Sequence, residues 1–216
     1  MRIDHHFHTT LHSPDSAMTP EAMIDRAVEL GLDALIVTEH DHQWSQEELA
    51  EINQRSRGIL VLSGVEVSAR EGHFLVYGLP DLADVGVGIT LKELLEVARR
   101  RGAAVVAAHP YRWGQDFERI AREFNDQLDA LELASKNVDQ HTRFLVERDL
   151  KRFPHLGCTG SSDAHHVNEL GCYYSELDGT IQDMAGFVQA LKQRRLKPRH
   201  HPAPSMVLTC GTLDED

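Results

Sequence analysis

The chain has 216 residues, of which 41% are hydrophobic and 26% are charged, and its formal net charge at pH 7 is −12. This length suits one larger α/β domain, and the balance of hydrophobic and charged residues excludes a disordered chain. The acidity argues against a broad basic track for long nucleic acids. No apolar run approaches the roughly 20 residues that span a bilayer. We expect a single domain over residues 1–216, with a C-terminal tail over about 198–216.

Cysteine usage bears on the compartment of the protein. Cys158, Cys172 and Cys210 are scattered and odd in number, without a CxxC pair. No basic-then-apolar signal peptide precedes Asp4. We therefore expect a reduced, cytoplasmic protein that does not associate with a membrane.

The first half of the chain alternates predicted strands and helices. A strand over residues 2–8 precedes a helix with Thr19 as its N-cap, Pro20 in its first turn and Gly31 as its stop. The apolar run over 33–40 predicts a buried parallel strand, and a helix follows over 45–56. Further strands are expected over 58–68 and 73–79.

The second half continues this alternation. A helix with Thr90 as its N-cap and Gly102 beyond its basic last turn leads to a strand that Pro110 ends. The later elements are a strand over 128–135, a helix over 139–153, a strand over 157–164 and a helix over 180–195. Strands alternating with helices indicate a parallel sheet with right-handed crossovers, and about seven strands are enough to close a barrel.

The stretch RIDHHFHTT, residues 2–10, places histidines inside the first apolar run. In a strand, side chains two residues apart share a face, so His6 and His8 point one way while His5 and Phe7 point the other. Two neighbouring imidazoles can begin a metal site. Ordinary surface histidines explain an HxH pair equally well, so the rest of the chain must decide.

Other metal-ligating side chains lie at or near the ends of the predicted strands. They are His40, Glu66, His73, His109, Asp163 and His165. Sites in α/β folds form at the carboxyl ends of the strands, although His73 opens its strand rather than ending it. A single histidine of this kind is more often a core residue, but a set at successive strand ends favours a shared metal cluster. Histidine with carboxylates suits two or three Zn²⁺, Mn²⁺ or Fe²⁺ ions, roughly 3.5–4 Å apart.

The motifs DHHFHTT…SPDS, TEHD, GVEVS, EGHFLVYGL, AHPY and GSSDAHH together resemble the ordered motifs of the PHP (polymerase and histidinol phosphatase) family. The resemblance runs from Asp4 to about His166. It implies an α/β fold, a distorted (β/α)7 barrel, with two or three divalent metal ions (Mn, Zn or Fe) at its C-terminal face. Most characterised members hydrolyse phosphate esters.

The resemblance also implies the ligand set. His6, His8, Glu66 and Asp163 would hold a first ion, and Glu66 would bridge to a second ion that His73 and His109 complete. His40 and His165 would hold a third, with help from Asp15 or, as the alternative, His12. We prefer Asp15, because SPDS fits the Ser-Asp pattern of the family with a small insertion.

Catalysis would then depend on Glu66, Asp163 and His165 around a hydroxide that bridges two ions. Glu39 stands where the family commonly has Asp, and we expect it to accept a hydrogen bond from a ligand imidazole.

Cations near the metals would complete the anion site. Arg112 is the first candidate for binding phosphate, followed by Lys136 and Arg70, although solvated surface charge explains the last two at least equally well. Tyr111 and Trp113 beside the AHP strand end are candidates for stacking a ring, with ordinary rim packing as the more common role.

The expected activity is metal-dependent hydrolysis of a small phosphomonoester. A nucleotide phosphodiesterase or exonuclease acting on short nucleic-acid ends is the alternative, so the expected partner is a small phosphorylated substrate or a nucleotide. A non-catalytic metal-binding module is a third hypothesis. It is disfavoured because the chain keeps the full set of ligands that the resemblance implies.

Overall fold

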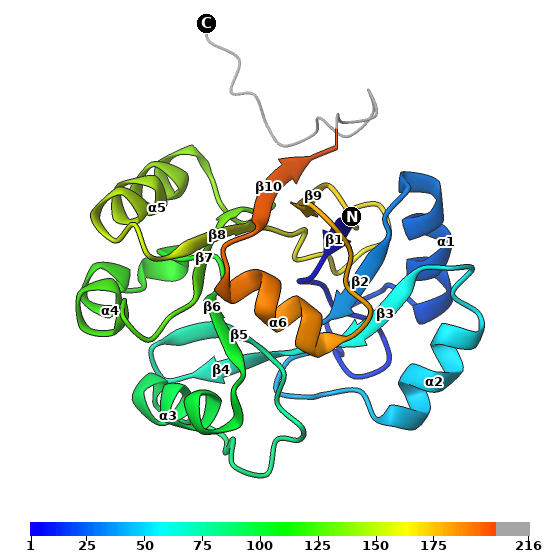
Figure 1. The fold of residues 1–216 in the computed structure, drawn as a ribbon, viewed down its shortest axis with the longest axis horizontal. Coiled ribbons are helices and arrows are strands. Elements are labelled where there is room, and N and C mark those ends of the chain that lie inside the picture. Colours follow the sequence, from blue (N-terminus) through cyan, green and yellow to red (C-terminus); the bar gives the residue numbers. More distant parts are fainter. Residues whose placement is uncertain (202–216) are drawn as a thin grey trace, which may run out of the picture.

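The computed structural model describes residues 1–201, so Cys210 and most of the expected tail lie outside the described residues. Helices and strands alternate along most of the chain (Figure 1). The helices are α1 (Pro20–Leu30), α2 (Gln46–Gln54), α3 (Leu91–Arg101), α4 (Phe117–Phe124), α5 (Gln140–Arg152) and α6 (Met184–Lys192), with a short 3₁₀ helix η1 (Arg112–Gly114). The strands are β1 (Arg2–Asp4), β2 (Ala34–Val37), β3 (Leu60–Ser63), β4 (Val65–Ala69), β5 (Gly72–Tyr77), β6 (Ala104–Ala107), β7 (Ala130–Ala134), β8 (Gly157–Gly160), β9 (Tyr173–Leu177) and β10 (Leu196–His200).

The strands form two five-stranded sheets, in the orders β10-β9-β1-β2-β3 and β4-β5-β6-β7-β8. Strands β1, β2 and β3 run parallel, as do β6, β7 and β8. Helices α1 to α5 lie around the outside of the strands, and α6 crosses the centre of the view (Figure 1). The parallel runs separated by helices confirm the expected α/β class.

The two sheets meet near the ends of β1, β2 and β8. Isolated bridges join Phe7 to Ala164 and His40 to Glu66. Backbone hydrogen bonds support both junctions, because Asp163 N donates to His6 O at 2.7 Å and Glu66 N donates to Glu39 O at 3.1 Å. The residues that follow β1 therefore lie beside those that follow β8. A closed seven-stranded barrel stays a prediction.

The strand expected over 58–68 is two strands. At Gly64 the chain leaves the first sheet and enters the second, and a Cβ atom there would approach the Tyr77 ring to 2.7 Å. Strands β9 and β10 were not predicted. The sequence of β10, LKPRH, has the charge and proline that mark a loop, but these residues also suit an exposed edge strand.

The helix caps confirm most of the predicted helices. Thr19 and Thr90 cap α1 and α3, and Gly31 and Gly102 end them in the left-handed conformation. Helix α6 begins at Met184, later than expected, because Asp183 is its N-cap. Helix α4 was missed because it has only eight residues, although Phe117, Ile120, Ala121 and Phe124 lie at helical spacing.

The core under α6 holds a buried polar group. The Phe187 ring lies 4.9 Å from Tyr77 and 5.5 Å from His5, measured between ring centroids. His5 Nδ1 is 2.8 Å from Tyr77 Oη, and His5 Nε2 is 3.1 Å from Ser175 Oγ. His5 thus points away from His6 and His8, as the strand alternation predicts.

Within residues 1–201, no helix is both long and apolar enough to cross a membrane.

Candidate metal centre

The ends of several strands bring the predicted ligands to one place. His6 and His8 follow β1, His40 follows β2 and His109 follows β6, while Asp163 and His165 follow β8. Glu66 and His73 come from the antiparallel pair β4 and β5, where Ser68 lies opposite His73. His6 and His8 are fully buried and Glu66 is 1% exposed.

Glu66 lies in the middle of the cluster, and its two carboxylate oxygens face different imidazoles. Oε1 is 2.9 Å from His73 Nδ1 and 3.1 Å from His109 Nε2. Oε2 has three nitrogen neighbours: His40 Nδ1 at 3.0 Å, His8 Nε2 at 3.2 Å and His6 Nε2 at 3.4 Å. A carboxylate placed in this way has the geometry to bridge two ions, one on each oxygen.

Asp163 completes the buried group with His6 and His8. Its Oδ1 is 3.3 Å from Nε2 of both histidines. Its Oδ2 contacts the Asn137 side-chain amide and lies 3.4 Å from the Arg112 guanidinium. Asp163 has a φ of +52°, an uncommon conformation for a residue other than glycine. The backbone therefore turns at the ligand itself.

A third group lies at the exposed side of the cluster. Asp15 Oδ2 is 3.2 Å from Nε2 of both His40 and His165. His12 points elsewhere, because its Nε2 hydrogen-bonds Glu48 Oε1 at 2.8 Å and its ring stacks on His42. Of the two candidates that the sequence left open, the structure brings Asp15 to the other ligands.

The carboxylates shift the pKa values of their neighbours. Burial alone would lower the pKa of His8, but the nearby carboxylates of Asp163 and Glu66 outweigh burial and raise it to about 9. Burial likewise opposes the raised pKa of His6, which the charge of Asp163 and Glu132 sustains. Burial would raise the pKa of Glu66, but the charge of His6 holds it well below its usual range. The site therefore attracts positive charge.

The donor set fits metal ions. Within residues 1–201, the buried atoms His6 Nε2, His8 Nε2 and Glu66 Oε2 have no well-aligned hydrogen-bond partner, although polar atoms lie 3.0–3.4 Å away and a buried polar atom ordinarily makes a hydrogen bond. Three groups have ligand atoms that all lie within 4.8 Å of one another: His8, His40 and His165; His6, His8, Glu66 and Asp163; and His40, Glu66 and His73. These overlapping clusters are consistent with a multinuclear metal site of nitrogen and oxygen ligands.

Glu132 on β7 supports the cluster and was missed by the sequence analysis. Its Oε1 accepts from His6 Nδ1 at 2.9 Å and from Ser161 Oγ at 2.5 Å, and its Oε2 accepts from His109 N at 2.7 Å. A bond at Nδ1 fixes the tautomer of His6 and leaves Nε2 free to bind a metal. The available signal was a charged residue within the apolar run LDALELAS.

In the part of the chain that the structure describes, no predicted ligand imidazole donates a hydrogen bond to Glu39, so that expectation is wrong. Its carboxylate accepts from Thr9 N and Oγ1, from Ser13 Oγ at 2.6 Å and from Trp44 Nε1 at 3.0 Å. Among the described residues, Ser13 connects the Glu39 carboxylate with a predicted ligand, because Ser13 Oγ lies 3.4 Å from His8 Nδ1. The chain turns after His8, which brings hydroxyl groups between Glu39 and the imidazoles.

The three cations proposed for phosphate lie in different places. Arg112 borders the cluster through Asp163. Lys136 Nζ pairs with Glu169 Oε2 at 2.6 Å, and that oxygen also accepts from His165 N.

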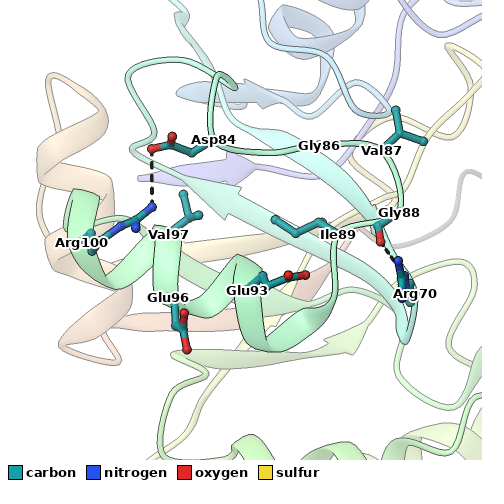
Figure 2. A pocket seen from close by; sticks show the side chains of 10 residues that line it. All are labelled: Arg70, Asp84, Gly86, Val87, Gly88, Ile89, Glu93, Glu96, Val97 and Arg100. Carbon is teal, nitrogen blue, oxygen red and sulfur yellow. Dashed lines mark hydrogen bonds and ion pairs between the residues drawn. The ribbon is translucent and has the colours of Figure 1, made fainter.

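Arg70 lies in a separate groove beside α3. There its Nε donates to Gly88 O at 2.7 Å, at the opposite end of the groove from Arg100 (Figure 2). Within residues 1–201, no hydrogen bond or ion pair joins Arg70 to the predicted ligands, so of the three cations only Arg112 directly contacts one of them through its side chain.

The fold and the predicted ligands define an α/β protein whose clustered histidine, glutamate and aspartate side chains are consistent with a multinuclear metal site. The chain belongs to the PHP domain family: the profile of the PHP domain matches residues 4–107, and that of the PHP-associated region matches residues 150–196.

Two relatives align with part of the chain. A 3',5'-nucleoside bisphosphate phosphatase of Chromobacterium violaceum is 37% identical over 134 residues, which is 56% of this chain and 46% of that protein. An uncharacterized protein of Methanocaldococcus jannaschii is 27% identical over 120 residues, 51% of this chain and 68% of that protein. The chain thus spans about half the length of the phosphatase.

Solved structures share the fold at low sequence identity. A two-domain protein from Bacteroides vulgatus that contains a predicted PHP-like metal-dependent phosphoesterase superposes with a TM-score of 0.73 at 20% identity, over 93% of this chain and 65% of that one. An amidohydrolase from Chromobacterium violaceum superposes with a TM-score of 0.64 at 19% identity, over 88% of this chain and 97% of that one.

Proposed function

We propose that the chain is a metal-dependent phosphoesterase that hydrolyses a small phosphomonoester. The observation that carries the proposal is the buried carboxylate of Glu66, whose two oxygens face five imidazoles from four different parts of the fold. Membership of the PHP domain family supports it, as does the 37% identity to a 3',5'-nucleoside bisphosphate phosphatase.

In this proposal the ligands keep the roles given by the sequence analysis. His6, His8, Glu66 and Asp163 hold one ion, His73 and His109 join Glu66 at a second, and His40, His165 and Asp15 hold a third. Mn²⁺, Zn²⁺ or Fe²⁺ would neutralise the phosphoryl oxygens and lower the pKa of a coordinated water. We also infer that strands from the two sheets together form a distorted (β/α)7 barrel, supported by the bridges after β1 and β2.

The side chains around the ligands position the substrate and the ligands themselves. Arg112 presents a guanidinium 3.4 Å from Asp163, where it would bind a phosphate oxygen. Glu132 holds His6 in the tautomer that leaves Nε2 free. Lys136 and Arg70 stay weaker candidates, since Glu169 and Gly88 already bind them. A single domain in a cytoplasmic location also remains part of the proposal.

The test compares a nitrophenyl phosphate monoester with the matching diester in the presence of Mn²⁺. The proposal expects a clear preference for the monoester. A preference for the diester would replace it with a nucleotide phosphodiesterase. No turnover of either compound by a chain shown to hold metal would favour a non-catalytic metal-binding module.

Glu66→Gln tests the bridging role directly. We expect the activity to fall at least about 100-fold, more than the loss of an outer hydrogen bond usually causes, while far-ultraviolet circular dichroism stays that of the wild type. Glu47→Gln on the exposed side of α2 makes the same chemical change away from the site and serves as the matched control. A Glu66→Gln variant as fast as the wild type would show that the assigned bridge is wrong.

A further inference from the structure

Trp113 is an exposed aromatic residue at the edge of the metal centre. Its side chain is 74% exposed, whereas Trp44, the other tryptophan of the chain, is 3% exposed. The indole lies beside two predicted ligands, with ring centroids 5.7 Å from His73 and 5.8 Å from His109. A large aromatic residue kept in solvent at this position calls for a partner, since burial of its apolar surface would otherwise be favourable.

The segment around Trp113 is held at both ends. On one side Tyr111 packs its ring on Phe117 and its hydroxyl donates to Asp149. On the other side Gln115 donates from Nε2 to Glu71 O at 2.9 Å and accepts from Tyr111 N at 3.2 Å. Tyr111 therefore has the rim-packing role that the sequence left open, and Trp113 does not.

The backbone between these anchors is unusual. Tyr111 has a φ of +70° and Trp113 a φ of +55°. Residues other than glycine seldom adopt such angles, and they persist where the surrounding structure enforces them, often at ligand-binding sites. A Cβ atom on Gly72 would meet the Gln115 side chain at 1.9 Å, so the absence of a side chain at Gly72 lets Gln115 anchor the segment. Trp113 is thus placed at the rim by its neighbours.

The charges near Trp113 select the kind of ring that it would bind. The Arg112 guanidinium lies over the indole, 3.9 Å from the ring centroid. A cationic group stacked there would meet a like charge, whereas a neutral base would not. Arg112 also faces Asp163, so its guanidinium links the indole with the cluster where a phosphate would bind. A phosphate and a flat neutral ring joined by a sugar fit this arrangement.

We propose that Trp113 is the stacking platform for the base of a nucleoside phosphate whose phosphate lies at the metal centre. The inference rests on the proposed function and names the substrate class for that site. It makes Trp113 a specificity-determining residue, because every base can stack on the indole whereas phosphate esters without an aromatic ring cannot.

The kinetic test uses adenosine 5'-monophosphate and ribose 5-phosphate, which differ only by the base. In Trp113→Ala we expect the KM for the nucleotide to rise roughly 5- to 150-fold, the range of one base–aromatic stack, with the kcat and both constants for ribose 5-phosphate unchanged. Trp113→Phe restores most of the loss. Phe144→Ala removes an exposed aromatic residue of α5 and is the matched control. An equal loss for both substrates would overturn the proposal.

A binding test separates this inference from the proposed function. In the metal-loaded chain, the non-hydrolysable phosphonate analogue of adenosine 5'-monophosphate is expected to quench tryptophan emission, and the corresponding analogue of ribose 5-phosphate is not. The quenching should vanish in Trp113→Phe, since the remaining Trp44 is buried. Hydrolysis without selective quenching would overturn the stacking role alone. Quenching without hydrolysis of either phosphate ester would retain the stacking role and overturn the proposed function.

Discussion

Glu132→Gln is the substitution that best tests how the metal centre is held together. The Glu132 carboxylate is fully buried and faces three donors: His6 Nδ1, Ser161 Oγ and His109 N. Glutamine has nearly the same size but offers one oxygen and one amide nitrogen. If the oxygen keeps His6 and Ser161, the nitrogen must face the His109 N–H, and two donors then meet.

The expected cost follows from that lost bond. A buried donor left without an acceptor costs about 1–3 kcal/mol, so the free energy of unfolding of the metal-free chain should fall by about that amount. Loss of the charge that orients His6 should also weaken metal binding, and removal of such an outer partner typically costs about 10–100-fold in affinity. His6 is affected because its Nδ1–H must point at an acceptor while Nε2 binds.

Two measurements check this expectation. Competition with a metal buffer gives the affinity for Mn²⁺ or Zn²⁺, and urea unfolding of the chelator-treated chain gives the free energy of unfolding. Glu47→Gln provides the control, because Glu47 is exposed on α2. A Glu132→Gln variant that binds metal as tightly as the wild type would refute the positioning role, whatever its stability.

Three further predictions concern the metal site and the cysteines. Asp15→Asn should weaken binding of the most exposed ion at least about tenfold, and His12→Ala should not; metal titration that shows the reverse would return His12 to the ligand set. Chelation should lower the midpoint temperature of thermal unfolding, and an unchanged midpoint would contradict a resident metal. Mn²⁺ added at about 100 times its Kd should raise the free energy of unfolding of the chelated chain by about 2.7 kcal/mol. Burial raises the pKa of the Cys172 thiol to about 12, so at pH 8 the thiolate is scarce and iodoacetamide should label Cys172 slowly until the chain unfolds, as mass spectrometry of its peptide would show.

Much of the candidate site could be predicted because its signals are local. Strand periodicity places His6 and His8 on one face, and an apolar run that ends in a polar residue marks the carboxyl end of a strand. The ends of the helices could be predicted equally well, since Thr90 and Gly102 make their capping hydrogen bonds to backbone groups only a few residues away. Such features need no knowledge of what packs against them.

The remainder depends on contacts between distant parts of the chain. Glu132 reaches His6 across 126 residues, and nothing near Glu132 in the sequence identifies that partner. Glu39 was assigned to an imidazole because it precedes His40, but the turn after His8 supplies nearer hydroxyl donors. Arg70 and Lys136 were chosen by proximity to motifs in the sequence, and local partners bind both.

The position of β1 makes the metal centre depend on contacts between residues far apart in the sequence. Strand β1 lies between β2 and β9, although β9 begins only at Tyr173. His6 likewise precedes its neighbour Asp163 by 157 residues. Folding must therefore wait for contacts of long sequence separation, which form slowly. A chain that stops before Asp163 has His6 and His8 without this carboxylate partner, so it cannot assemble the cluster of His6, His8, Glu66 and Asp163.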